Sequence, residues 1–110
     1  MEISQRMAGE VAVVEISGEI DGSTAPEAQA QILALAAPNS KILIDMSRVG
    51  YMSSAGLRML LVVYRTASGQ GGKVVLTGLS QDLEDTMSLT GFLEFFDHFE
   101  SISAGLAAFN

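Results

Sequence analysis

Two adjacent serines, Ser53 and Ser54, stand where an apolar segment gives way to an apolar helix. The pattern predicts a strand over residues 41–46, a loop over 47–53 and a helix over about 54–68. A serine in the first turn of that helix is exposed, beside backbone N–H groups that have no partner within the helix. A phosphate on its hydroxyl would meet those N–H groups and the positive end of the helix dipole. The fold would accept this charge, whereas a docked protein would not, so the junction suits a phosphorylation switch.

The same serines also have a purely structural interpretation. A serine that precedes a helix most often only caps it, an interaction worth about 1 kcal/mol. The residue types and their spacing therefore leave both the switch and the cap open.

Few other side chains have a recognisable chemistry. The chain has no Cys and His98 is its only histidine, so neither a thiolate metal site nor a histidine pair can form. The carboxylates of Asp82, Glu84 and Asp85 are explained more simply by a helix start than by a metal. The glycine-rich residues 69–72 lead into a strand and lack the lysine of a phosphate-binding loop. We therefore expect no enzymatic activity, no cofactor and no bound metal.

The composition describes one acidic globular domain. The 110 residues include 6 Lys and Arg against 13 Asp and Glu, a net charge of −7, and 48% of them are hydrophobic. Such a chain forms a single domain over residues 1–110, and its charge disfavours nucleic acid and anionic membrane surfaces as partners. No signal peptide is recognisable, and the longest apolar run, residues 59–64, is far too short to cross a bilayer. We expect a cytoplasmic protein.

The first third of the chain is expected to hold short strands and one helix. The extended segments are residues 2–7 at an edge, 11–16 and 19–21. A helix then begins after Thr24, with Pro26 in its first turn and Glu27 at the spacing of a capping box. It ends at Ala37, because Pro38 disfavours helical geometry in the residue before it.

The remaining two thirds are expected to alternate between strands and helices. Strands are predicted over residues 41–46, 73–77 and 95–100, and helices over 54–68, from the Ser80 cap to Gly91, and over 102–109. The helix over 54–68 is expected to bury Leu57, Leu60, Leu61 and Tyr64. A helix between two buried strands forms a βαβ unit with parallel strands. The expected fold is α/β: a mixed sheet, antiparallel at its N-terminal strands and parallel in its βαβ units, packed with about four helices.

Two longer motifs include the serine junction and the turn before the first helix. The first motif is Asp45-Met46-Ser47, then Tyr51-Met52, then Ser53-Ser54-Ala55-Gly56-Leu57. The second motif is Gly18-Glu19-Ile20-Asp21, followed by Thr24-Ala25-Pro26. Together they resemble the anti-sigma-factor antagonist family, whose domain is called STAS. The order of elements agrees too, so the resemblance covers nearly the whole chain.

The resemblance implies a protein that binds its partner only when it is unphosphorylated. In the family, a serine kinase with a histidine-kinase-like ATP-binding fold phosphorylates the antagonist, and this kinase is often also the anti-sigma factor. The unphosphorylated antagonist binds that partner and thereby frees the sigma factor. A metal-dependent PP2C-type phosphatase restores the antagonist. The implied function is that of an anti-sigma-factor antagonist in a partner-switching pathway.

Matched position by position, the resemblance assigns the phosphoacceptor role to Ser54. Ser53 stands where the family has an aspartate, and Ala55 where it has a second serine. Ser53 is therefore an alternative acceptor. Asp21 matches an acidic residue near the acceptor and is expected to orient the kinase or the phosphoserine; as an alternative it only caps its own turn.

The helix after Ser54 is apolar almost all round, which favours a second contact surface. Met59 and Val63 lie off its expected buried stripe and are predicted to face a partner, unless they pack against the third helix. Arg58 is expected at the rim of that contact. The partner-binding surface is thus predicted to comprise Asp21, Thr24, Ser53, Ser54, Ala55, Gly56, Arg58, Met59 and Val63.

Other functions remain open at this point. The domain could be a STAS subunit of a fixed assembly, such as a transporter accessory or scaffold protein, that binds without being switched. A nucleotide-binding protein is a weaker alternative, because the chain has no phosphate loop or catalytic cluster. A receiver-type phosphoacceptor is disfavoured, because Asp45 lacks the acidic pair and the downstream lysine expected around it.

Overall fold

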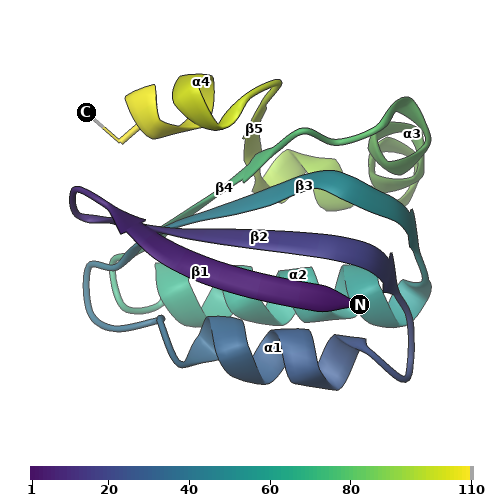
Figure 1. Ribbon diagram of the computed structural model, residues 1–110, viewed down its shortest axis with the longest axis horizontal. Helices are drawn as coiled ribbons and strands as arrows, with labels where there is room; N and C mark the ends of the chain where they lie inside the picture. The colour runs from purple at the N-terminus through teal and green to yellow at the C-terminus, as the bar shows by residue number, and fades with distance from the viewer. Residues whose placement is uncertain (110) are drawn as a thin grey trace.

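The computed structural model describes residues 1–109, which form one five-stranded sheet with helices on both faces (Figure 1). The strands are β1 (Glu2–Ala8), β2 (Val11–Ile20), β3 (Lys41–Met52), β4 (Lys73–Thr77) and β5 (Asp97–Phe99). The helices are α1 (Ala25–Leu33), α2 (Ser54–Ser68), α3 (Gln81–Thr90), the 3₁₀ helix η1 (Phe92–Phe95) and α4 (Ile102–Ala107).

The sheet has the mixed topology that the sequence predicts. Its strand order is β1-β2-β3-β4-β5; β1 pairs antiparallel with β2, and every later pair is parallel. The predicted α/β fold with an antiparallel start, parallel βαβ units and four α-helices is confirmed.

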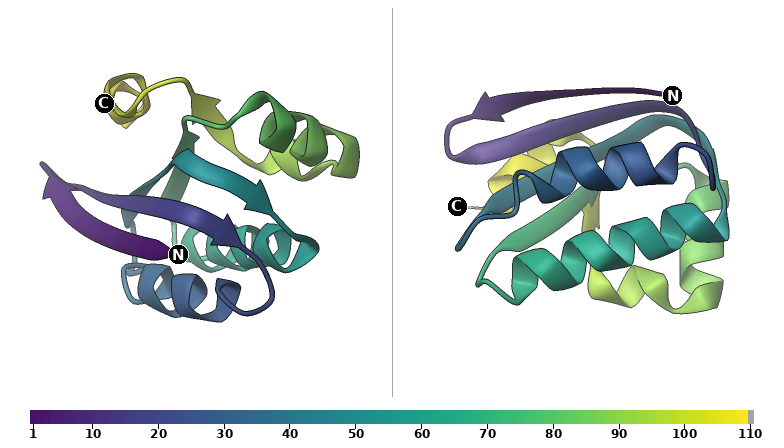
Figure 2. Two further views of the ribbon diagram at one scale, coloured as in Figure 1. Left: turned by 45° about the vertical axis from the view of Figure 1, so that its right-hand side comes forward. Right: turned by 90° about the horizontal axis from the view of Figure 1, so that it is seen from below.

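The two faces of the sheet have separate cores. In Figure 1, α1 and α2 lie below the sheet and α4 lies above it, and Figure 2 shows α1 and α2 side by side. Because side chains alternate along a strand, Ile42 and Ile44 join the large core under the sheet. Leu43, between them, joins a smaller core under α4 with Val11 and Val13.

Two strands run further than predicted. β2 continues through Gly18, and β3 continues through the stretch expected to be a loop. The register shifts between Glu15 and Ser17 and again before Glu19, and Gly18 has φ +99°, a backbone conformation suited to glycine. After these bulges the strands pair again, with Ile20 opposite Met52. The glycine thus marks a bulge and not a strand end.

The first helix also differs from the prediction. It ends at Leu33, before the predicted end at Ala37. The capping box does not form, because the Thr24 hydroxyl turns away from the helix. It donates to the Glu19 carbonyl at 2.9 Å and accepts the Asp21 N–H at 2.9 Å.

The later elements follow the sequence more closely. α2 covers the predicted range, Ser80 caps α3 through the Leu83 N–H at 3.2 Å, and Gly91 ends α3 with φ +80°. β5 is shorter than predicted, because residues 92–95 form η1, and α4 ends at Ala107.

Candidate functional site

The serine junction lies where β2 and β3 leave the sheet together. Ile20 and Met52 are opposite each other in the last pair of the two strands. Asp21 and Ser53, the next residues, therefore leave the sheet as neighbours, and the Ser53 N–H donates to the Ile20 carbonyl at 2.8 Å. The turn before α1 and the first turn of α2 thus form one surface, on the right-hand side of Figure 1.

Gly56 allows the first turn of α2 to press against these strand ends. A Cβ at this position would overlap the Met52 side chain and stand 3.0 Å from Ile20 Cγ2 and 3.2 Å from the Ile20 carbonyl oxygen. Gly56 is buried. The expectation that it contacts a partner is wrong; its part is to let the helix start close to the sheet.

The two serines of the junction differ in accessibility. Ser54, the first residue of α2, is exposed, whereas Ser53 is half-buried. The Ser53 hydroxyl oxygen is shielded from solvent and has no hydrogen-bond partner among residues 1–109. No side-chain cap closes this helix start in the part of the chain that the structure describes. The cap interpretation of Ser53 is therefore wrong.

The first turn of α2 presents positive potential without a carboxylate of its own. The first N–H groups of any helix have no partner within it and carry the positive end of the dipole. The first turn of α2 contains no acidic residue, whereas that of α3 contains Asp82 and Glu84. An anion on the Ser54 hydroxyl would meet no negative charge from its own turn.

Asp21 and Thr24 brace the neighbouring turn. Asp21 Oδ1 accepts the Ser23 hydroxyl at 2.7 Å and the backbone N–H groups of Ser23 at 2.9 Å and Thr24 at 3.2 Å. The Ser23 hydroxyl and N–H are the main causes that lower the pKa of Asp21 below its ordinary value. The turn-forming role of Asp21 is thus visible in the structure, and its role toward a kinase stays a prediction.

The second contact surface, which was predicted on α2 around Met59 and Val63, is not exposed. Met59 is 1% exposed and Val63 0%, because α2 packs on both the sheet and α1, so the prediction that these two face a partner is wrong. Leu61 and Tyr64, predicted to be buried, are only partly so. Ala55 is half-buried against the core.

The outward face of α2 instead carries an exposed stripe that begins at Ser54. Ser54, Arg58 and Val62 follow one another at intervals of four, and all three are exposed. Arg58 is therefore exposed one turn from Ser54, and its place at the rim of a partner contact stays a prediction. Val62 was not predicted to belong to the site, although its i, i+4 spacing from Arg58 was the available signal. Tyr51, which is 53% exposed at the end of β3, was not predicted to belong to it either.

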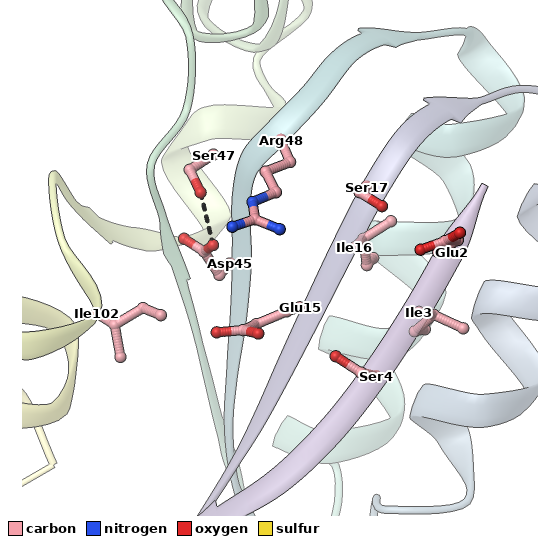
Figure 3. Close-up of a pocket in the computed structure, with 10 residues that line it drawn as sticks. All are labelled: Glu2, Ile3, Ser4, Glu15, Ile16, Ser17, Asp45, Ser47, Arg48 and Ile102. Carbon is pink, nitrogen blue, oxygen red and sulfur yellow. Dashed lines mark hydrogen bonds between the residues drawn. The ribbon is translucent and has the colours of Figure 1, made fainter.

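Asp45 and Ser47, from the beginning of the first motif, form structural hydrogen bonds. Asp45 is buried, and one of its carboxylate oxygens accepts the Thr77 hydroxyl at 2.9 Å. The other accepts the Ser47 hydroxyl at 2.7 Å (Figure 3). The Thr77 bond ties β4 to β3, whereas the Ser47 bond lies within β3. Together the two bonds satisfy the carboxylate.

A cavity of about 350 Å³ lies beside these residues, over β1, β2 and β3 and next to Ile102 at the start of α4. The charged side chains that line it are Glu2, Glu15, Asp45 and Arg48 (Figure 3). None of the predicted site residues lines it.

No group of three or more His, Cys, Asp or Glu side chains is placed to hold a metal ion within residues 1–109. None of the helices described is both long enough and apolar enough to span a bilayer.

The chain is similar to anti-sigma factor antagonists in sequence and in fold. It is 32% identical to the anti-sigma-B factor antagonist of Bacillus subtilis, over 76% of this chain and 77% of the relative. The crystal structure of an anti-sigma factor antagonist from Mycobacterium paratuberculosis superposes with a TM-score of 0.87, at 28% identity, over 97% of this chain and 92% of that one.

A third similarity extends to a phosphorylated protein. The structure of the Bacillus cell fate determinant SpoIIAA in its phosphorylated form superposes with a TM-score of 0.76. The match covers 99% of this chain and all of that one, and at 17% identity it shows a shared fold alone. The profile of the STAS domain matches residues 2–105. The chain therefore belongs to the STAS domain family, as its two sequence motifs predict.

Proposed function

We propose that the protein is an anti-sigma-factor antagonist whose binding is switched by phosphorylation of Ser54. The observation that carries the proposal is the contrast at the junction: the Ser54 residue is exposed at an uncapped helix start, and the Ser53 hydroxyl is shielded. The Bacillus subtilis relative and the Mycobacterium structure support the antagonist role. The phosphorylated SpoIIAA structure supports the view that this fold accepts a phosphate.

The switch works through charge at a surface that a partner must cover. A seryl phosphate carries roughly −1.5 to −2 charges at neutral pH. At the start of α2 it meets free N–H groups, so the fold remains intact. In an interface with a partner, the phosphate would lose its hydration without an opposite charge to compensate for it, so the complex dissociates. The surface proposed to be covered includes Ser54 and Arg58, with Val62 and Tyr51 as its apolar part.

The proposed partners are those that the resemblance to anti-sigma-factor antagonists implies. They are a serine kinase and anti-sigma factor with a histidine-kinase-like ATPase fold, and a PP2C-type phosphatase that removes the phosphate. The protein itself acts by binding, without catalysis, and in the cytoplasm. Asp21, beside the junction, is proposed to orient the kinase or the phosphoserine.

The test compares one added charge at two helix starts. Ser54→Asp places a carboxylate at the start of α2, and the control Ser80→Asp places the same group at the start of α3, where aspartate is also a good cap. Binding to the kinase partner is measured by calorimetry, and folding by circular dichroism. The proposal expects Ser54→Asp to weaken binding at least about tenfold, a difference of about 1.4 kcal/mol in binding free energy. Its fold should remain intact, and Ser80→Asp should bind the partner as tightly as the wild type does.

Two results would contradict the proposal. Equal binding by the wild type and Ser54→Asp would show that the surface is not covered at this point. Binding that is tight but insensitive to phosphorylation would favour a STAS subunit of a fixed assembly.

A further inference from the structure

The sheet has one long free edge, formed by β1. The strand order places β1 and β5 at the two edges, and β5 has only three residues while β1 has seven. Five of the seven residues of β1 are exposed, and Figures 1 and 2 show no helix beside its outer edge. Backbone groups on the outer side of an edge strand are unpaired and can pair with another strand.

The charged side chains of β1 lie on one face. Glu2 is opposite Ser17, Ser4 opposite Glu15, and Arg6 opposite Val13. Val13 belongs to the core under α4, so Glu2, Ser4 and Arg6 share the face that carries α4. The charges of Glu2 and Arg6 form only weak interactions within the chain. An Arg6 guanidinium nitrogen lies 3.9 Å from a Glu15 carboxylate oxygen at an exposed position, and no ion pair of Glu2 occurs in residues 1–109.

The sequence of β1 is complementary to itself when two copies run antiparallel. Outer-edge hydrogen bonds and side-chain faces both repeat every second residue, so only registers whose paired residue numbers add to an even sum are possible. With Ser4 opposite Ser4 of a second copy, Glu2 of each chain lies opposite Arg6 of the other. This register gives two cross-strand ion pairs related by a twofold axis, as an isologous interface requires.

We propose that the protein self-associates through β1, in this register, to form a twofold dimer with a continuous ten-stranded sheet. The occupant of the edge is thus a second copy of this chain. The association is independent of the proposed function, because β1 contains none of the residues assigned to the Ser54 surface.

Charge reversal within the edge tests both the surface and the register. Arg6→Glu places two pairs of carboxylates opposite each other across the dimer, and Glu2→Arg places two pairs of guanidinium groups. Opposite charges across strands stabilise a pair and like charges destabilise it, so each single variant is expected to weaken dimerisation about tenfold or more. The double variant Glu2→Arg/Arg6→Glu restores both ion pairs and is expected to dimerise within about threefold of the wild type.

Mixing the two single variants provides the sharpest test. One variant then carries only cations at positions 2 and 6 and the other only anions, so together they form a heterodimer although each alone is impaired. Sedimentation equilibrium of the full chain, over a concentration series up to the millimolar range, measures all five samples. Thermal unfolding checks that each variant is folded, and added salt is expected to reduce the differences between them.

The proposal is overturned by a wild-type chain that stays monomeric throughout the series. It is also overturned by single variants that dimerise as well as the wild type, since the contact would then lie elsewhere or in another register. A double variant as impaired as the single ones, or a mixture without heterodimer, would equally exclude the Glu2–Arg6 pairing.

Discussion

The first turns of α2 and α3 begin alike and are completed differently. Each follows a strand of the parallel sheet, and each is preceded by a serine with extended backbone, Ser53 (φ −79°, ψ 177°) and Ser80 (φ −66°, ψ 161°). Ser80 accepts an N–H of its helix, and two carboxylates occupy the first turn of α3. Ser53 accepts none, and the first turn of α2 has no carboxylate.

The difference depends on what the first turn of each helix packs against. In α3 the third residue is Leu83, whose N–H bonds to the cap. In α2 the third residue is Gly56, which lies against Ile20 and brings the whole turn onto the sheet. At this helix start the Ser53 hydroxyl is shielded from solvent and Ser54 is exposed. The start of α3 is thus stabilised by its own cap and carboxylates. The start of α2 has neither, and this open helix start can accept an anion.

The largest expected effect comes from filling the space at Gly56. Gly56→Ala should lower the free energy of unfolding by about 1–3 kcal/mol, because the added methyl group overlaps the strand ends. Urea denaturation measures the loss. Gly22→Ala is the control, because a Cβ at Gly22 would have no atom within 4 Å. Equal stability of Gly56→Ala and the wild type would remove the packing explanation for the open helix start.

The serines that precede α2 and α3 should respond differently to removal of the hydroxyl. Ser80→Ala should lower the free energy of unfolding by about 1 kcal/mol, because it removes the hydrogen bond that caps α3. Ser53→Ala should leave stability unchanged or raise it, because the lost hydroxyl is shielded and unbonded. Parallel urea titrations compare the two variants. A similar cost at both positions would mean that Ser53 caps α2 in solution.

Charge in the first turn should stabilise α2 where it is missing. Ser54→Asp is expected to raise the free energy of unfolding by about 0.3–1 kcal/mol at low salt, through the helix dipole. Asp82→Asn should lower it by a similar amount in α3, which already carries the charge. Both changes should shrink in high salt. Destabilisation by Ser54→Asp that persists in salt would argue against an anion-accepting helix start.

The smallest expected effect concerns the contribution of Asp21 to stability at acidic pH. The Ser23 hydroxyl and backbone N–H, with Thr24, hold the pKa of Asp21 below its ordinary value of 3.8. As the pH falls below this value, the unfolded chain takes up the proton before the folded chain does, so the contribution of Asp21 to stability is lost. The stability difference between the wild type and Asp21→Asn should therefore narrow as the pH is lowered from 5 through this range. A difference that stays constant with pH would contradict these bonds.

The sequence predicted those features that depend on local patterns. The range of α2 and the ends of α3 followed from apolar periodicity and from Ser80 and Gly91. The order of strands and helices was sufficient for the mixed sheet. The exposure of Ser54 was also predicted, because a residue in a first helical turn beside a buried strand has little else to pack against.

The features that were missed depend on contacts between distant segments. β2 and β3 extend beyond Gly18 and Ser47 because each supplies the other with backbone partners, although both residues are typical of turns. Met59 and Val63 are buried because α2 has neighbours on two sides, which a single apolar stripe does not anticipate. Whether a serine caps its helix was equally invisible, since Ser53 and Ser80 differ only in what surrounds them.

The location of the phosphate tests the central claim most directly. The wild type, Ser54→Ala and Ser53→Ala are incubated with candidate serine kinases and ATP, and the modified residue is identified by tandem mass spectrometry. The account predicts one phosphate on Ser54 in the wild type and in Ser53→Ala, and none in Ser54→Ala. A phosphate that persists in Ser54→Ala and lies on Ser53 would contradict it.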